Sequence, residues 1–403
     1  MAVEFISAIN VNPSNEVNGL SQPAIDVDYL KKYSRALEEG GFDYTLLPYG
    51  SPAHDPFTLA AVVTQHTERL KPIVALRPNT VYPTVAAKAL ATLDQLSRGR
   101  AVVHFISGGN DHEQAREGDY SSKDERYDRT EEYIRILRQV WAADAPFDHE
   151  GRFYRFEDFV SVVKPVNGTI PISIGGSSEA AYRIGGVLGD IFGLWGEPLA
   201  DTRFQIDKVA KAARAAGRTD RPRTWVTFRP IIAPTEELAW EKANKILGIL
   251  ESRSAAAQQA VGKELWIQRR RRSGDGPQNV GSQRLLEIAA RGDLHDRALW
   301  TPTATATGAQ GASTALVGTP ETVAAAILDY VDLGADLISI RGYDNYNDAV
   351  DYGRYLIPLV RQELAHREAT GRRGEVVDQR PLDEVVRERE ERHDGRELEG
   401  VGA

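Results

Sequence analysis

The feature that most constrains the fold of this chain is a regular alternation of short apolar segments with longer amphipathic ones. Helix start signals open several of the longer segments, for example Asp26 before Val27 and Ser178 before Glu179. Alternating strands and helices are typical of a parallel sheet that is covered by helices. Eight segments are predicted to be strands: 5–10, 44–48, 72–76, 101–107, 170–174, 191–195, 224–233 and 337–341.

Two architectures share this pattern, the open doubly wound sheet and the closed (β/α)8 TIM barrel. A doubly wound sheet that binds a dinucleotide carries a glycine-rich fingerprint directly after its first strand. Here the first predicted strand runs instead into the polar segment Val11-Asn12-Pro13-Ser14-Asn15. Because barrels of this kind often exceed about 250 residues as one unit, we predict a single (β/α)8 TIM barrel over residues 1–371.

Two segments interrupt the alternation. Residues 251–311 lie between the seventh and eighth predicted strands and are rich in Arg, Gln and Gly, whereas residues 372–403 are dominated by charge. Loops at the carboxyl end of a barrel often close over the site, so residues 251–311 form either a mobile lid or a surface insertion. The C-terminal arm, 372–403, has too few apolar residues for its own core and is either solvated or docked on another subunit.

The composition of the chain excludes several kinds of catalytic and metal site. The chain of 403 residues has no cysteine, which excludes disulfides, thiolate metal sites and cysteine nucleophiles. Its net charge of −9 argues against general nucleic-acid binding, and the run Arg269–Arg272 is better interpreted as part of a solvated helix. No Gly-x-Ser-x-Gly elbow, Walker loop or His-Glu-x-x-His pair is present. Any redox chemistry therefore needs a cofactor.

The sequence also indicates in which cellular compartment the protein is found. The N-terminal residues lack the basic and apolar regions of a secretion signal, and no window approaches the roughly 18 apolar residues of a membrane span. We therefore expect a soluble, cytoplasmic protein that binds no membrane.

The end of the fifth predicted strand is a candidate anion site. Gly175, Gly176, Ser177 and Ser178 follow it and lead directly into a helix. Glycines allow a ligand to approach the backbone, and a helix N-terminus offers unpaired N–H groups to a phosphate. The same residues are also typical of a tight turn with an N-cap serine, so the residues alone leave both interpretations open.

The fourth predicted strand brings His104 and Ser107 to the same end of the barrel. The period of two in a strand should direct His104 into the barrel, where it could hydrogen-bond a ring edge or be a satisfied core histidine. His112 and Glu113 follow, but their spacing matches no zinc signature, so we predict no metal site.

Other strand ends supply cations and rings. These candidates are His54, Arg77, Trp195, Arg229, Arg341 and Tyr343. Arginines and aromatic rings around one barrel mouth would form a positive, partly apolar pocket that suits an anionic ligand. Each arginine could equally pair with a neighbouring carboxylate as scaffolding.

Longer motifs run through these strand ends, including ALRP at 75–78, ATLDQLSRGR at 91–100, DERY at 124–127, GGSS at 175–178 and WGEP at 195–198. Together with segments 84–87, 314–318 and 342–343, they resemble the bacterial-luciferase-like flavin-dependent monooxygenases, specifically the alkanesulfonate monooxygenase branch. The resemblance covers roughly residues 1 to 365 and leaves out the charged arm.

The resemblance implies a two-component enzyme. A separate NAD(P)H-dependent flavin reductase would supply reduced FMN, O2 would be the co-substrate, and the protein would be a homodimer or homotetramer. By position, Tyr127, Ser177 and Ser178 would hold the flavin phosphate, while His104 and Ser107 would lie near the isoalloxazine. We expect the substrate side to be formed by Trp195, Arg229, Arg341 and Tyr343, with His54 and Arg77 completing the catalytic set.

The alkanesulfonate branch implies a substrate whose C–S bond is cleaved to give an aldehyde and sulfite. The branch has a cysteine in place of His54, an asparagine in place of His104, and an Arg-x-His pair where this chain reads Thr227-Phe228-Arg229. The arginine of the branch's mobile loop finds no clear match near Gly308, and Arg341 could compensate. These departures favour a bulkier or more polar sulfonate, such as a sugar sulfonate.

Two other enzymatic functions stay open at this point, and a non-enzymatic alternative is a barrel that only senses or binds flavin. The same flavin chemistry could act on a non-sulfonate organosulfur compound, an amine or a heterocycle. A deazaflavin cofactor could also transfer a hydride without oxygen.

Overall fold

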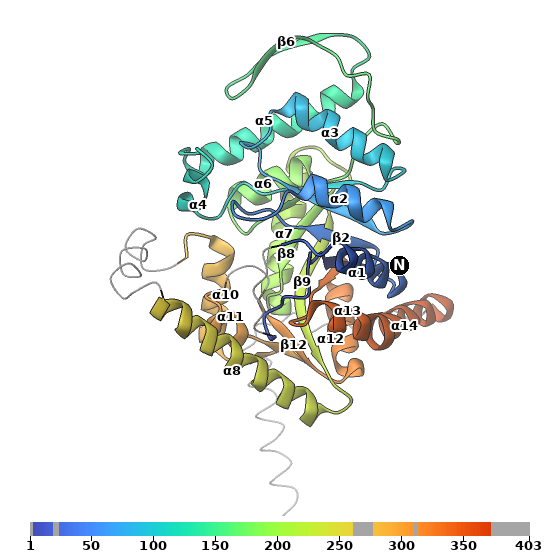
Figure 1. Cartoon of the computed structure of the whole chain (residues 1–403), viewed down its shortest axis with the longest axis vertical. Helices are drawn as coiled ribbons and strands as arrows, with labels where there is room; N and C mark the ends of the chain where they lie inside the picture. The colour runs from blue at the N-terminus through green and yellow to red at the C-terminus, as the bar shows by residue number, and fades with distance from the viewer. Residues whose placement is uncertain (1–2, 19–23, 261–276, 310–312, 372–403) are drawn as a thin grey trace, which may run out of the picture.

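The computed structural model describes residues 3–18, 24–260, 277–309 and 313–371 and is built around a closed barrel. Eight parallel strands follow one another around the barrel in chain order, and β9 pairs with both β8 and β13 to close it (Figure 1). The strands are β1 (Glu4–Ala8), β2 (Tyr44–Leu47), β3 (Lys71–Leu76), β4 (Val102–Phe105), β7 (Ile172–Gly175), β8 (Ile191–Trp195), β9 (Arg223–Ile232) and β13 (Ala335–Ile340).

All eight strands lie where the alternation predicts them, and the prediction of a (β/α)8 TIM barrel is confirmed. Their nearly continuous apolar character has a simple cause, because strands of such a barrel are buried on both faces. In β3, for example, every residue after Lys71 is buried. Side chains on one face fill the barrel interior, and those on the other face pack against the surrounding helices.

Helices form the outer layer of the barrel. Asp26 and Ser178 cap α1 and α6 by accepting hydrogen bonds from the backbone N–H groups of Tyr29 and Ala181, as the sequence predicts. Within the described residues, no helix combines the length and apolar content needed to cross a bilayer. The outer helices are α1 (Val27–Glu39), α2 (Pro56–Gln65), α3 (Pro83–Leu96), α4 (Asp111–Ala115), α5 (Lys123–Ala142), α6 (Glu179–Leu188), α7 (Leu199–Ala215), α12 (Pro320–Leu333), α13 (Asn345–Asp351), the π-helical turn η1 (Tyr352–Leu356) and α14 (Ile357–Thr370).

A two-stranded hairpin that the sequence did not suggest follows α5. Its strands, β5 (Phe147–Glu150) and β6 (Arg155–Phe159), pair antiparallel and lie at the outer edge of the molecule beyond α3 and α5 (Figure 1). Both strands mix charged and aromatic residues and have no buried residue, so they lack the apolar run that marks a core strand.

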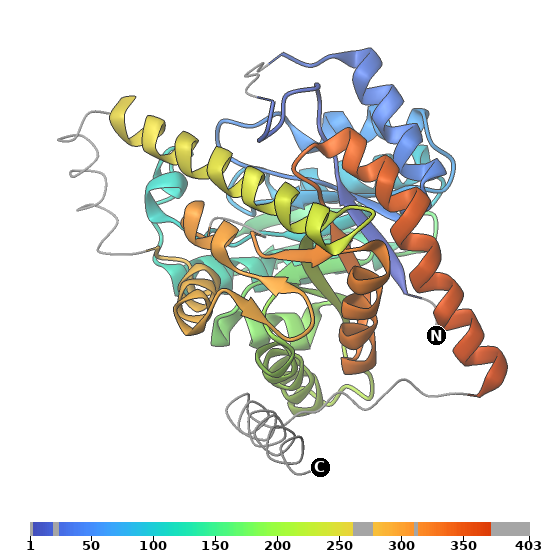
Figure 2. The same ribbon diagram turned by 90° about the horizontal axis from the view of Figure 1, so that it is seen from below.

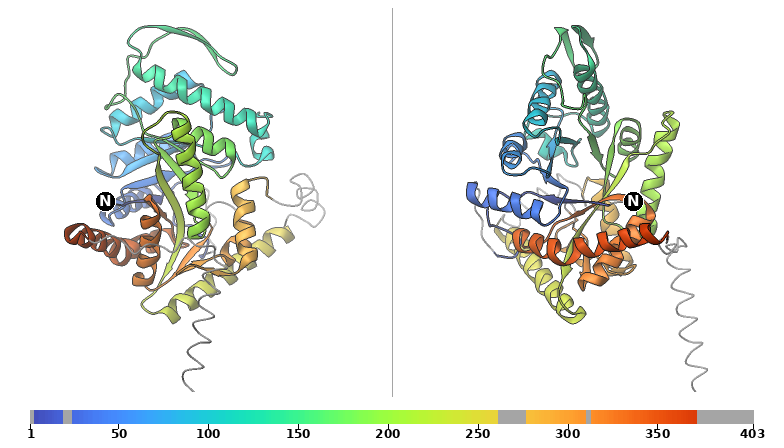
Figure 3. Two further views of the ribbon diagram at one scale, coloured as in Figure 1. Left: turned by 180° about the vertical axis from the view of Figure 1, so that it is seen from behind. Right: turned by 90° about the vertical axis from the view of Figure 1, so that its right-hand side faces the viewer.

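A long excursion separates β9 from α12. It contains α8 (Glu236–Ala260), α10 (Val280–Arg291), the short strands β10 (Leu294–His295) and β11 (Leu299–Trp300), α11 (Pro302–Ala306) and β12 (Ala315–Gly318). Helix α8 crosses one side of the molecule as a single long rod (Figure 2). Strand β9 is the longest strand and extends beyond the barrel, where its outer half pairs with β12 (Figure 3). The run Arg269–Arg272 and the arm 372–403 lie outside the described residues.

Candidate functional site

One large cavity lies at the carboxyl ends of the barrel strands. Its volume is about 1580 Å³, and residues at or just beyond the end of every barrel strand line it. This volume exceeds the range of roughly 300–1000 Å³ that is usual for a pocket holding one small ligand, so the cavity has room for a cofactor and a substrate together. The carboxyl end is also where barrel enzymes carry their reactive groups.

The predicted anion site forms part of this cavity wall. Gly175 to Ser178 line it between the end of β7 and the start of α6. Gly176 has a φ of 139°, and a Cβ at this position would lie 2.9 Å from the Ala181 Cβ and 3.1 Å from the Tyr127 hydroxyl. The backbone therefore requires glycine here, and the N-terminus of α6, where Ser178 caps the Ala181 N–H, borders the cavity where a phosphate could bind.

Helix α5 supplies the second side of this cradle. Tyr127 is buried against it, and its hydroxyl hydrogen-bonds with the Ser178 side chain. Lys123 lies one helical turn before Tyr127 and also lines the cavity. A hydroxyl and a cation therefore flank the helix N-terminus, which is a donor set that fits a phosphate dianion.

Ser107 lies two residues beyond the end of β4. Its hydroxyl is 2.9 Å from the Thr130 hydroxyl, and its carbonyl accepts a hydrogen bond of 3.1 Å from the Arg126 Nε. Arg126 also donates to Asp111, so this buried arginine fixes the loop after β4 and does not face the ligand space. Ser107 itself lines the cavity, as the prediction requires.

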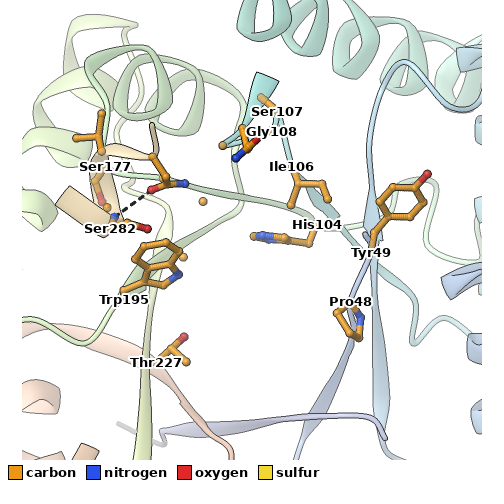
Figure 4. A pocket seen from close by; sticks show the side chains of 18 of the residues that line it. Pro48, Tyr49, His104, Ile106, Ser107, Gly108, Ser177, Trp195, Thr227 and Ser282 are labelled. Carbon is orange, nitrogen blue, oxygen red and sulfur yellow. Dashed lines mark hydrogen bonds between the residues drawn. The ribbon is translucent and has the colours of Figure 1, made fainter. Parts of the chain in front are cut away.

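His104 points into the middle of the cavity, between Trp195 on one side and Tyr49 on the other (Figure 4). Its Nδ1 is 2.9 Å from the Ser173 hydroxyl, and its ring centroid is 5.3 Å from that of Trp225. Burial lowers the pKa of His104 to about 4. The imidazole is therefore neutral at pH 7 and can either donate or accept one hydrogen bond toward a ligand.

Two carboxylates neutralise the positive charge of Arg77. Its guanidinium is 2.8 Å from a Glu113 oxygen and also pairs with Glu117, which accepts a hydrogen bond from the Tyr49 hydroxyl. Arg77 therefore reaches the cavity wall as part of a buried ion network. Glu113 takes part in this network, and no group of three or more potential metal ligands occurs among the described residues.

Arg229 and Arg341 form a pair of cations on the cavity wall. Arg229 lies on β9 and Arg341 directly follows the adjacent strand β13, one position beyond the paired residues Phe228 and Ile340. Arg229 is 3% exposed, donates a hydrogen bond of 2.9 Å to the Gly342 carbonyl, and lies with its guanidinium carbon 3.6 Å from the centroid of the Tyr343 ring. The pKa of Arg341 is lowered, mainly by the neighbouring charge of Arg229.

Of the three remaining predicted site residues, one lines the cavity and two do not. Trp195 lines the cavity and packs against α10, since a Cβ at Gly281 would lie 2.8 Å from its ring. Tyr343 is buried behind Arg229, and His54 lies in the loop before α2. Among the described residues, the wall of this cavity includes neither Tyr343 nor His54.

The start of α10 also lines the cavity, which the sequence did not suggest. Asn279 caps this helix and packs against Gly109, where a Cβ would lie 2.5 Å from the Asn279 amide nitrogen. Gln278 accepts a hydrogen bond of 2.9 Å from the Asp111 backbone N–H. Pro277 and Asn279 are ordinary helix-start residues, but only their contact with the loop after β4 identifies them as wall residues.

Known proteins share this architecture. The sequence matches the family described as luciferase-like monooxygenase over residues 8–337. A riboflavin lyase is similar at 21% identity and a TM-score of 0.74, covering 90% of this chain and 92% of its own. The EDTA monooxygenase of Chelativorans sp. BNC1 is similar at 18% identity and a TM-score of 0.69, covering 90% and 94%. A long-chain alkane monooxygenase is similar at 18% identity and a TM-score of 0.70, covering 90% and 92%.

Proposed function

Because this chain belongs to the luciferase-like monooxygenase family, we propose that it is a reduced-FMN-dependent, two-component monooxygenase of a small anionic substrate. The observation that carries the proposal is that one cavity contains both a phosphate cradle and a separate pair of arginines. The cradle suits the anionic end of FMN, and the arginines suit an anionic group on the substrate. A partner flavin reductase would deliver the reduced cofactor.

The residues of the cradle fit FMN in a specific way. The N–H groups at the start of α6, the Ser177 hydroxyl, the Tyr127 hydroxyl and the Lys123 ammonium would hold its phosphate. When bound, reduced FMN supplies the activation of O2 from which one oxygen atom passes to the substrate. Ser107 and the neutral His104 would hold the edge of the flavin ring by hydrogen bonds.

Apolar residues around this position would keep water away from the reacting atoms. Ile106, Leu194, Trp195 and Trp225 line the same cavity, and the start of α10 lies over Trp195. Exclusion of water limits hydrolytic and proton-leak side reactions of an activated cofactor. We propose that residues 251–311, of which 261–276 and 310–311 lie outside the described residues, act as the lid that completes this enclosure.

An organosulfonate is the substrate class that we propose first. Arg229 and Arg341 can donate several hydrogen bonds to the oxygens of a sulfonate. Oxygenation of the carbon that bears the sulfonate would then release an aldehyde and sulfite. The test is a screen of linear, aromatic and sugar sulfonates with FMN, NADH and a generic flavin reductase, with sulfite as the readout. Oxygen-dependent sulfite release supports this substrate class, whereas turnover of other compounds without sulfite would exclude it.

A second candidate is the same chemistry on an anionic amine. The structural similarity to an EDTA monooxygenase favours it, because EDTA combines amine nitrogens with carboxylates that two arginines could bind. Formation of an aldehyde from an aminocarboxylate, without sulfite, would support this candidate. Activity that depends on a deazaflavin and needs no O2 would exclude both monooxygenase functions and support a deazaflavin-dependent oxidoreductase instead.

A further inference from the structure

Glu16 contacts both arginines of the cavity wall from outside the cavity. It lies in the loop between β1 and α1, which the sequence marked only as a polar segment. Its carboxylate pairs directly with the Arg229 guanidinium, and one of its oxygens is 3.6 Å from an Arg341 nitrogen. Among the described residues, Glu16 is not part of the cavity wall, whereas both arginines are. The carboxylate therefore contacts both arginines without lining the cavity itself.

The pair needs such a support. Two guanidinium groups on neighbouring strands repel each other, and the charge of Arg229 is the main cause of the lowered pKa of Arg341. Arg229 is almost completely buried, and in the described residues its Nε has no hydrogen-bond acceptor. A shared carboxylate offsets this repulsion and the desolvation of the buried Arg229. The two arginines also lower the pKa of Glu16 against the opposing effect of burial, so this carboxylate is ionised at neutral pH.

The loop that carries Glu16 is fixed at two points. The Asn10 side chain donates hydrogen bonds of 2.8 Å to the carbonyls of Asn12 and Ser14. From the other side, Arg253 of α8 donates a hydrogen bond of 3.3 Å to the Asn15 carbonyl. The excursion between β9 and α12 thus contacts the loop that carries Glu16.

We propose that Glu16 is a positioning residue that holds Arg229 and Arg341 side by side, so that both can bind the same anionic group of the substrate. The inference rests on the proposed function and deepens it, because it makes the β1–α1 loop a determinant of anion affinity. Glu16 could instead compete with the ligand for the arginines, and the two roles predict opposite effects of removing its charge.

The test measures binding of 1-pentanesulfonate to the full-length protein in the presence of FMN by isothermal titration calorimetry. A misplaced arginine would lose a charge-assisted hydrogen bond to the sulfonate, which costs about tenfold in affinity. We therefore expect Glu16→Gln to weaken binding by about that factor. Glu16→Asp keeps the charge and should recover most of the affinity. Arg253→Gln should weaken binding less, in the same direction, because it loosens the loop without removing the carboxylate.

The controls separate this inference from the proposed function. The exposed Glu39→Gln variant removes one carboxylate elsewhere and should bind like the wild type, and FMN affinity should be equal in all variants. Unchanged or tighter binding by Glu16→Gln, when Arg229→Ala weakens it, overturns the inference alone. If the wild type does not bind 1-pentanesulfonate, or Arg229→Ala binds it equally well, the anion pocket itself is wrong and both proposals fall.

Discussion

We propose that Arg229 and Arg341 select an anionic ligand, because both line the cavity wall at the last two strands of the barrel. Arg77 differs from them, since Glu113 and Glu117 both pair with it. A buried cation with two carboxylate partners stabilises the wall but offers little to an incoming anion. We therefore expect arginines to have two different roles at this barrel mouth.

Replacing either arginine of the pair should affect the substrate and spare the cofactor. We expect Arg229→Ala and Arg341→Ala to raise the KM for an anionic substrate by roughly tenfold to a hundredfold, as the loss of a charged hydrogen bond predicts. Affinity for reduced FMN should stay constant, because the cradle lies on β7 and α5. Steady-state kinetics with the exposed Arg354→Ala as control checks this, and equal KM values in all three variants would contradict it.

His104 should make the stability of the protein depend on pH. Its pKa is about 4 in the folded chain because burial disfavours the charged ring, against an ordinary value of 6.5 in the unfolded chain. Between these values the unfolded chain binds more protons, so stability is lost as pH falls through this window. We expect His104→Gln to remove roughly 2 to 3 kcal/mol of that loss.

Urea unfolding of the wild type, His104→Gln and the exposed variant His366→Gln at a series of pH values would measure this effect. The His366→Gln variant should retain the pH dependence of the wild type. A His104→Gln curve that falls as steeply as the wild type below about pH 6 would show that His104 is not the group responsible.

At this scale the sequence predicted which residues on or beside the strands reach the cavity wall, but it did not predict the contributions of the loops. His104, Arg229 and Arg341 lie on or just after parallel strands, and the carboxyl ends of such strands meet at one end of a barrel. Glu16 and Asn279 come from connections whose path no local pattern specifies. The positions of Tyr343 and His54 show the same limit, because a residue one or two places past a strand end can face the wall or lie behind it.

Helix α10 is the element that joins the excursion to the barrel mouth. Arg284 of α10 donates hydrogen bonds of 2.9 and 3.2 Å from its Nε to the carboxylate of Glu197, which is only 1% exposed and follows β8. Burial raises the pKa of Glu197, and Arg284 opposes this effect. The ion pair therefore anchors α10 where Gly281 can pack on Trp195.

Breaking this pair from one side should destabilise the protein. Arg284→Met leaves Glu197 buried without its partner, which should cost about 3 kcal/mol of unfolding free energy. The double variant Arg284→Met/Glu197→Gln removes the orphaned charge and should recover part of that loss. Denaturant unfolding of the three proteins measures both values. A double variant that is less stable than Arg284→Met would argue against this account of the pair.

The sequence predicted the elements of the barrel better than its additions. The eight barrel strands are apolar because both of their faces are buried, and this pattern is visible in any one of them. The strands β5 and β6 are exposed and charged, and β10 and β11 have two residues each, so they carry no such pattern. Strand β12 is buried, but it pairs with the part of β9 that extends outside the barrel. It is therefore not one of the eight barrel strands that the alternation predicted.

At the scale of the whole molecule, the C-terminal arm, residues 372–403, follows the last helix of the barrel. Helix α14 ends at Thr370, and Gly371 follows with a φ of 63°, the left-handed conformation that commonly stops a helix. The charged residues 372–403 lie outside the described residues. We predict that they contribute to a homodimer or homotetramer, because a charged arm with a few apolar anchors can dock along a neighbouring subunit.

Deleting residues 372–403 should therefore weaken oligomerisation or lower activity. Light scattering coupled to size-exclusion chromatography would give the molecular mass at several protein concentrations, and the monooxygenase assay would give the activity. A truncated protein with the same mass and the same activity as the full-length chain would show that the arm is only a solvated extension.

An anaerobic titration of the full-length protein with reduced FMN tests the central claim, which is that the cradle between β7 and α6 holds the cofactor phosphate. The wild type should bind one FMN per chain, whereas Ser177→Ala/Ser178→Ala and Gly176→Ala should bind it at least about tenfold more weakly. Gly168→Ala is the matched control, because Gly168 also has a positive φ but no atom within 4 Å of its Cβ position. Absence of binding by the wild type, or equal affinity in all four proteins, would contradict the claim.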